Sequence, residues 1–255
     1  MTKYAYFLAE GQQDIEFLSR ILKVFYCLNK VKQIDDLDKF WHHLIPSKFP
    51  YKGDLLKRVP VPLFLQDSQS EYSIALHSSR GIDRMVEILE ENIVLIDGDL
   101  LTGVGIFLDA DLNEKPEQRH QEFFKKLNSR PNNSPLSSFN KEKVEVFIAP
   151  DNETQGTLES ILLKLAELNY PDLLILAERY YAAVDKSKLC SKDLREEKKP
   201  AGRSKILVSL IASFLKPGKS LSTTLNDNGW IVQGNSSLTE IKKIRDFLDL
   251  VLYAD

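Results

Sequence analysis

Two kinds of hydrophobic pattern alternate along the first two thirds of the chain. Short continuous apolar runs are typical of strands buried on both faces, and they occupy residues 4–9, 73–77, 104–108 and 144–149. After each run, apolar residues recur at helical spacing, within residues 15–25, 81–91, 116–127 and 157–168. This alternation predicts an α/β fold with a mainly parallel sheet, right-handed crossovers and helices on the faces of the sheet.

Two other parts of the chain depart from this alternation. Residues 35–71 show no clear period and contain several prolines, which indicates an irregular insertion after the first helix. From residue 171 onward only helical patterns and turns occur. We therefore expect an α/β domain over residues 1–170 and a helical C-terminal region over residues 171–255 that packs on it.

Composition indicates a protein of the cytoplasm. The 255 residues are 43% hydrophobic, which supplies an ordinary core for one large domain or two small ones. No apolar run is long enough to span a membrane, and Glu10 and Asp14 interrupt the pattern of a signal peptide. Cys27 and Cys190 belong to no metal-binding cluster, so reduced thiols are expected.

Four acidic residues follow predicted strands: Glu10, Asp109, Asp111 and Asp151. The carboxyl ends of parallel strands meet at one edge of a sheet, so these side chains are expected near one another. Carboxylate oxygens suit hard cations such as Mg²⁺, which takes one or two protein carboxylates and keeps several waters. In an extended segment Asp109 and Asp111 would point to the same side. The sequence thus predicts a Mg²⁺ site led by this Asp-Ala-Asp segment.

Each of these acids also has a purely structural interpretation. The Asp-Ala-Asp segment is equally typical of a polar turn or a helix N-cap. Asp14 is expected to cap the first helix, and Glu159, in the first turn of a later helix, would stabilise the helix dipole. A structural α/β domain whose acids cap helices therefore stays open at this point.

Three segments resemble a known family. The segment YFLAEGQQDIEFLSRIL resembles the first motif of TOPRIM domains, a strand that ends in Glu-Gly and is followed by a helix. GIFLDADLN resembles their DxD motif on a later strand. IAPDNETQGTLESIL and the C-terminal GRSKILVSLIASFL resemble an uncharacterised TOPRIM-related family close to the OLD-type nucleases. The resemblance covers most of the chain outside residues 35–71.

The resemblance implies Mg²⁺-dependent, nuclease-like hydrolysis of phosphodiesters in nucleic acid or nucleotides. Asp109 and Asp111 would hold Mg²⁺ or Mn²⁺, Glu10 would be a ligand or general base, and Glu159 would help to bind a second ion. Lys205 would stabilise charge in the transition state, although an exposed helix lysine is its simpler interpretation. The implied partners are DNA or RNA, an ATPase encoded by a neighbouring gene, and a second copy of the chain in a homodimer.

The charge distribution limits nucleic-acid binding to a local segment of the chain. The net charge is −3, so the molecule as a whole offers no broad attraction to phosphates. Within residues 186–205 eight cations outnumber three anions, a pattern of either a local phosphate-binding segment or a solvated linker. The alternative function is therefore a non-catalytic TOPRIM-like module that binds nucleic acid, nucleotide or a partner protein in a defence or repair system.

Overall fold

The chain forms two compact units. The structure is a computed structural model and describes residues 2–47 and 61–253. Residues 48–60 of the predicted insertion lie outside the described residues. Unit 1 comprises Met1–Leu108, His120–Phe147 and Ile244–Asp255, and unit 2 comprises Asp109–Arg119 and Ile148–Lys243.

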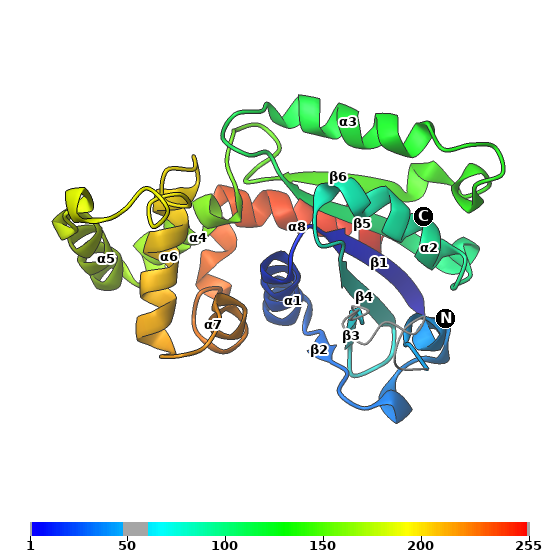
Figure 1. The fold of residues 1–255 in the computed structure, drawn as a ribbon. Coiled ribbons are helices and arrows are strands. Elements are labelled where there is room, and N and C mark those ends of the chain that lie inside the picture. The colour runs from blue at the N-terminus through cyan, green and yellow to red at the C-terminus, as the bar shows by residue number, and fades with distance from the viewer. Residues whose placement is uncertain (1, 48–60, 254–255) are drawn as a thin grey trace. The chain divides into compact units, whose positions relative to one another are not determined.

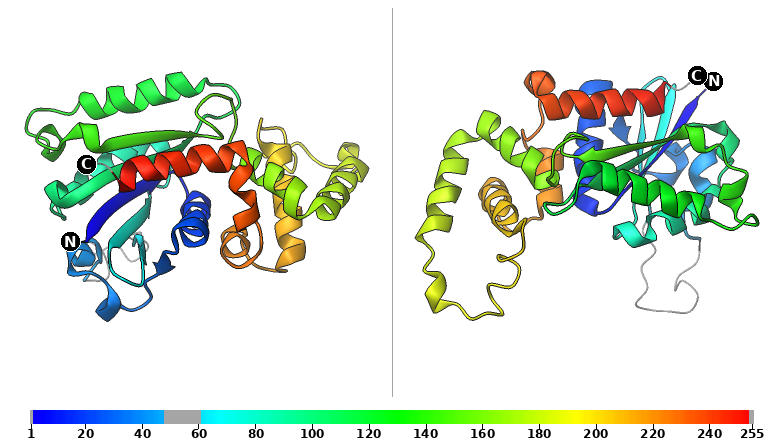
Figure 2. Two further views of the ribbon diagram at one scale, coloured as in Figure 1. Left: turned by 180° about the vertical axis from the view of Figure 1, so that it is seen from behind. Right: turned by 90° about the horizontal axis from the view of Figure 1, so that it is seen from above.

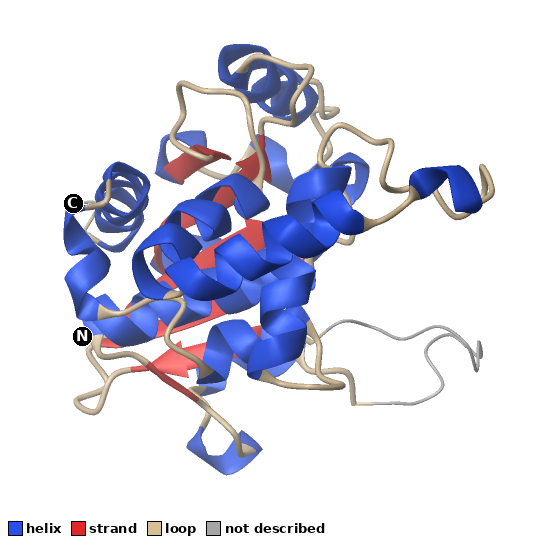
Figure 3. Cartoon of the chain, turned by 90° about the vertical axis from the view of Figure 1, so that its left-hand side faces the viewer, coloured by secondary structure: helices blue, strands red, loops and turns tan. Residues whose placement is uncertain are grey.

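A mostly parallel sheet of six strands, in the order β2-β3-β4-β1-β5-β6, forms the centre of unit 1 (Figure 1). β1 pairs in parallel with both β4 and β5, whereas β3 is antiparallel to β4 and β2 is antiparallel to β3. The strands are β1 Lys3–Ala9, β2 Asn29–Lys30, β3 Leu63–Gln66, β4 Tyr72–Ser78, β5 Leu101–Asp109 and β6 Val144–Ala149. Helices lie over the sheet, as Figure 3 shows.

Apart from the short α7, the α-helices agree closely with the hydrophobic periodicity. They are α1 Gln12–Tyr26, α2 Met85–Ile93, α3 Pro116–Asn128, α4 Leu158–Asn169, α5 Pro171–Ala183, α6 Gly202–Leu215, α7 Leu221–Asp227 and α8 Thr239–Leu252. Short 3₁₀ helices are η1 Ile34–Asp36, η2 Lys39–Leu44, η3 Ile82–Arg84, η4 Gly98–Leu100, η5 Pro135–Ser137, η6 Lys141–Lys143, η7 Lys186–Lys188 and η8 Gln233–Ser237.

The predicted α/β class and mainly parallel sheet are confirmed, with additions. All four predicted strands are present as β1, β4, β5 and β6. The sequence did not predict β2, β3 or α7, because segments of two, four and seven residues are too short to show a period. β3 lies inside the region expected to be irregular and adds an antiparallel strand to the sheet.

Alternation along β1 assigns helices to the two faces of the sheet. On one face, the ring of Phe7 contacts Phe247 of α8, with centroids 6.1 Å apart, and Phe17 of α1 lies 6.2 Å from Phe107. α8 approaches β5 closely, because a Cβ on Gly103 would lie 2.5 Å from the backbone oxygen of Val251. α1 and α8 therefore cover the same face.

The other face of the sheet carries a buried polar network. Asn92 of α2 donates to the Tyr6 hydroxyl at 2.6 Å, and that hydroxyl lies 2.9 Å from Nδ1 of His77. Nearby, Trp41 of η2 is fully buried and donates from Nε1 to the Ser73 hydroxyl at 2.9 Å. These bonds satisfy polar atoms on strands that are otherwise apolar.

Unit 2 is a helical unit built on two segments that leave the sheet. Within it, α4 packs on α5 and α6, α5 packs on α6, and α6 packs on α7 (Figure 2). Its core is formed by fully or almost fully buried side chains, among them Leu162, Leu165, Leu207, Ile211, Leu225 and Trp230. No helix among the described residues has the length and apolar character needed to cross a membrane.

The compact units divide the chain differently from the expected boundary at residue 170. Residues 148–170, including α4, group with the C-terminal helices. The end of α8 groups instead with the sheet, because Phe247 packs between Phe7 and Phe147.

Candidate functional site

Asp109 joins the end of β5 to the start of α4. One of its carboxylate oxygens, Oδ1, accepts a hydrogen bond from the backbone N–H of Leu158, the first residue of α4, at 2.9 Å. The first N–H groups of a helix have no partner within the helix, and the helix dipole favours an anion there. Asp109 therefore stabilises the N-terminus of α4, as the capping interpretation of this segment predicts.

Asp111 is held in an unusual backbone conformation by its neighbours. Its φ of 59° lies in the left-handed region, which aspartate enters more readily than most residues. Its backbone oxygen accepts from the N–H of Gly156 at 3.1 Å, which ties this loop to the segment before α4. The side chain is 57% exposed and forms an ion pair with Arg119. The carboxylate is thus both fixed in place and open to solvent.

Arg119 organises the loop that contains both aspartates. It is only 9% exposed, and its Nε donates to the backbone oxygen of Asp109 at 3.2 Å. One terminal nitrogen of the guanidinium pairs with Asp111 and the other with Glu114, the latter at 3.2 Å. Arg119 was not among the residues expected at the site, and its only sequence signal is a cation in the first turn of the helix after the DxD segment.

Glu159 lies at the same end of α4 as the carboxylate of Asp109. It is 6% exposed, and its Oε2 accepts from the hydroxyl of Thr157, the N-cap residue, at 2.7 Å. The structure therefore brings Asp109 and Glu159 to one helix terminus, where their negative charges complement the helix dipole.

The carboxylate of Asp151 accepts hydrogen bonds from its own loop. Its Oδ1 accepts from the backbone N–H groups of Glu153 and Thr154, at 3.0 and 2.7 Å, and from the Thr154 hydroxyl at 2.9 Å. Burial raises the pKa of this carboxyl, but the hydrogen bonds from Thr154 and Glu153, with the nearby charge of Lys243, outweigh it and set the pKa below its ordinary value. Asp151 thus shapes the turn after β6.

The acids of the first motif belong to unit 1. Glu10 directly follows β1, and its backbone oxygen accepts from Gly81 N–H at 3.1 Å and from the Ser78 hydroxyl at 3.3 Å. Asp14 accepts from the N–H of Gly11 at 2.8 Å, so the predicted cap of the first helix is confirmed.

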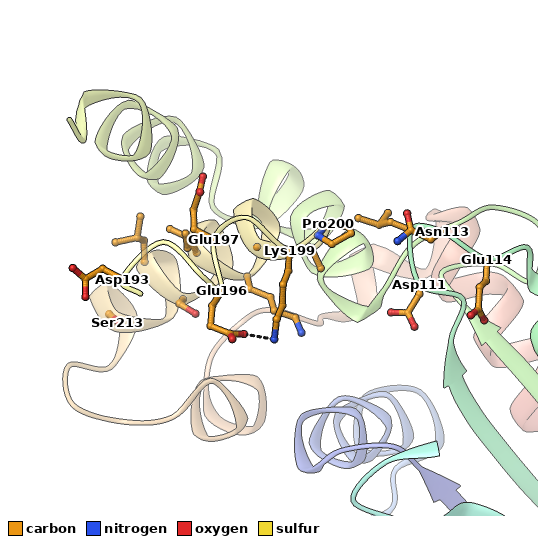
Figure 4. Close-up of a pocket in the computed structure, with 16 residues that line it drawn as sticks. Asp111, Asn113, Glu114, Asp193, Glu196, Glu197, Lys199, Pro200 and Ser213 are labelled. Carbon is orange, nitrogen blue, oxygen red and sulfur yellow. Dashed lines mark ion pairs between the residues drawn. The ribbon is translucent and has the colours of Figure 1, made fainter. Parts of the chain in front are cut away.

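A pocket of about 720 Å³ lies within unit 2 (Figure 4). Two predicted site residues, Asp111 and Lys205, line it. An ion pair of 2.6 Å between Lys199 and Glu196 lies on its wall. The other lining residues are Leu112, Asn113, Glu114, Asp193, Glu197, Pro200, Ala201, Gly202, Ile206, Ser209, Leu210 and Ser213.

One face of α6 supplies the pocket with polar groups. Lys205, Ser209 and Ser213 are spaced by four residues, so they follow one another along a single side of the helix. Gly202, the first residue of α6, also lines the pocket. The pocket thus combines two ammonium groups, two hydroxyls and a helix N-terminus with five carboxylates, among them that of Asp111.

The four acids predicted as metal ligands do not form a ready-made site in this structure. Among residues 2–47 and 61–253, no group of three or more His, Cys, Asp or Glu side chains is arranged to hold a metal ion. The extended conformation expected for the DxD segment is not observed, because Asp111 has a left-handed φ of 59°. The Asp109 carboxylate bonds to the start of α4, and the Asp111 carboxylate pairs with Arg119. A Mg²⁺ bound here would take only one or two protein carboxylates and would keep most of its waters.

Comparisons with known proteins place the chain in a family. No curated protein matches it. Among solved structures, it is similar to hypothetical protein PH0156 from Pyrococcus horikoshii OT3, with 16% sequence identity and a TM-score of 0.55 over 99% of this chain and 98% of that one. At 16% identity this similarity shows a shared fold and nothing further. A family model matches residues 4–251, so the chain belongs to the family described as "Protein of unknown function (DUF3226)".

Proposed function

We propose that this protein is a Mg²⁺-dependent, TOPRIM-type enzyme that hydrolyses phosphodiester bonds in nucleic acid or nucleotides. One observation carries the proposal: Asp111 of the DxD segment and Lys205 of α6 line the same pocket. A carboxylate that holds a cation and an ammonium group that attracts phosphate are complementary parts of a phosphate-processing site.

The pocket has the volume for a phosphorylated ligand of nucleotide size. Its volume of about 720 Å³ is within the range of pockets that bind small molecules. The ammonium group of Lys205 would bind phosphate oxygens, with the Ser209 and Ser213 hydroxyls beside it on the same helix face. The N-terminus of α6, at Gly202, adds partial positive charge at the pocket wall.

Asp109 and Asp111 would hold the Mg²⁺, and Arg119 would keep Asp111 in position. A bound Mg²⁺ neutralises charge on the phosphate and makes a bound water more acidic. Lys205 would counter the charge that develops on the phosphate oxygens. The roles of Glu10 as ligand or base and of Glu159 at a second ion stay predictions from the sequence resemblance.

The topology of the sheet supports the TOPRIM assignment. The strands that carry the first motif and the DxD motif, β1 and β5, are parallel neighbours whose register pairs Ala9 with Phe107. Functional groups in such sheets collect at the carboxyl ends of the strands. The proposed setting is the cytoplasm, with DNA or RNA as substrate and a neighbouring-gene ATPase as protein partner.

The test is a hydrolysis assay with plasmid and single-stranded DNA in the presence of Mg²⁺ or Mn²⁺. It compares the wild type with Asp111→Asn, chosen because asparagine also tolerates the left-handed conformation. Asp246→Asn, at an exposed position of α8, is the matched control. The proposal predicts metal-dependent cleavage that falls at least about a hundredfold in Asp111→Asn alone. Cleavage that is absent, or equal in both variants, would contradict it.

A second function, a non-catalytic binding module, is favoured by a different observation. Asp109 already accepts from the end of α4, and Asp111 is already paired with Arg119. Several cations of the basic segment 186–205 are also paired with acids, such as Lys186 with Glu197. For this function we expect a labelled nucleotide or oligonucleotide to bind equally well in Mg²⁺ and in EDTA and not to be cleaved. Binding that requires the metal would exclude it.

A further inference from the structure

α5 is an apolar helix with an exposed outer side. Its sequence, PDLLILAERYYAA, is hydrophobic on several sides, yet Ala177 is its one buried residue. Ile175 is 46% exposed, Leu176 is 56% exposed and Tyr180 is 60% exposed. A helix of this composition is usually covered on most sides. Within unit 2, α4 and α6 pack against α5, and they leave these side chains uncovered.

Five of the exposed residues form one stripe along the helix. Asp172, Ile175, Leu176, Arg179 and Ala183 follow the three- and four-residue spacing of a single helix face, and all five are exposed. Figure 2 shows α5 beside α6, one of the two helices that pack against it. We call these five residues the α5 stripe.

The charges of the α5 stripe are self-complementary. Asp172 precedes the Ile175–Leu176 pair by three residues, and Arg179 follows it by three. If two copies of the helix pack antiparallel about a two-fold axis at this pair, Asp172 of each copy faces Arg179 of the other. Among the described residues, neither Asp172 nor Arg179 has an ion-pair partner within 4 Å.

We propose that the α5 stripe is the interface of a homodimer, in which α5 of one copy packs antiparallel on α5 of a second copy. The apolar pair at the centre would be buried on association, and two symmetry-related Asp172–Arg179 ion pairs would set the register. A different protein would need its own matching charges, whereas a second copy has them by symmetry. The proposal is independent of the proposed enzymatic function.

The test is a charge exchange followed by sedimentation equilibrium of the full chain over a range of concentrations. For the wild type we expect the mass to rise from that of the 29.2-kDa chain towards twice that value. Asp172→Arg and Arg179→Asp each place like charges opposite one another, and each should weaken the homodimer by about tenfold or more. An equimolar mixture of the two variants restores both attractive pairs, so it should form a heterodimer of wild-type affinity.

Glu122→Arg, which makes the same charge change at an exposed position of α3, is the control and should associate like the wild type. Recovery in the mixture cannot come from unfolded variants, so it separates an interface effect from a folding defect. A wild type that stays monomeric at all concentrations would overturn the proposal. So would single variants that associate like the wild type, or a mixture that associates no better than its components.

Discussion

The guanidinium of Arg119 pairs with the carboxylate of Asp111, while its Nε donates to the backbone oxygen of Asp109 at 3.2 Å. One buried side chain thus holds both ends of the DxD segment. Arg119→Ala would remove the bonds to Asp111 and to the Asp109 carbonyl, and also the ion pair with Glu114. We therefore expect a loss of about 1–3 kcal/mol in the free energy of unfolding. Urea denaturation followed by circular dichroism measures it.

The control for Arg119→Ala is Arg84→Ala, which removes an ion pair to Glu87 that is about half exposed on both sides. Exposed pairs contribute little, so its effect should stay under about 1 kcal/mol. Equal losses in the two variants would show that Arg119 has no special role in the loop.

The close packing of β5 against its neighbours makes Gly105 sensitive to substitution. A Cβ at this position would lie 2.3 Å from Cδ1 of Phe7 and 3.0 Å from Cζ of Phe247. Gly105→Ala should therefore destabilise the protein by about 1–3 kcal/mol through overpacking. Thermal unfolding measures the loss, with Gly234→Ala as control because no atom lies within 4 Å of its added Cβ. A melting temperature unchanged in Gly105→Ala would contradict this packing.

Asp151 should make stability depend on pH in the acidic range. Its pKa is lower in the folded protein than its ordinary value of 3.8, so the ionised carboxylate stabilises the fold above that value. The contribution is lost as the pH falls through the lowered folded pKa. Asp151→Asn should therefore be less stable than the wild type at pH 7 by about 1 kcal/mol, and the difference should shrink at strongly acidic pH.

The measurement for Asp151 is urea unfolding at neutral and at strongly acidic pH. Asp83→Asn serves as control, since the Asp83 side chain is 90% exposed and should show no such trend. A difference between Asp151→Asn and the wild type that grows on acidification would have the wrong sign for a lowered pKa.

Lys205 should contribute to phosphate binding in the pocket. Lys205→Ala is expected to weaken binding of a labelled nucleotide by roughly tenfold at low salt, because it removes a cation that faces the ligand. Lys242→Ala, an exposed lysine of α8 that does not line the pocket, is the control. Fluorescence anisotropy gives both affinities. Equal affinities in the two variants would assign Lys205 the simpler role of an exposed helix lysine.

Strands buried on both faces were the most predictable part of the fold. The run before Pro150 has the bounds of β6, Val144–Ala149, because a strand covered on both sides needs apolar residues at every position. β2 and β3 could not be predicted, since strands of two and four residues are too short to show a pattern and depend on their pairing partners. The exposure of α5 could not be predicted either, because an apolar sequence by itself predicts burial.

The candidate site was predictable only in part. Asp109 could be found because a polar residue that ends a buried strand has no packing role there. That its carboxylate meets the N–H of Leu158 depends on how two distant segments fold together. The role of Arg119 was likewise out of reach, because it depends on the left-handed turn at Asp111 that brings residues eight apart into contact.

Titration with Mn²⁺, followed through the electron paramagnetic resonance signal of the free ion, tests most directly whether the DxD segment holds a divalent cation. We expect saturable binding to the wild type and to Asp246→Asn, and binding at least about tenfold weaker to Asp111→Asn. A wild type without saturable binding, or an Asp111→Asn variant that binds as tightly as the wild type, would contradict this expectation.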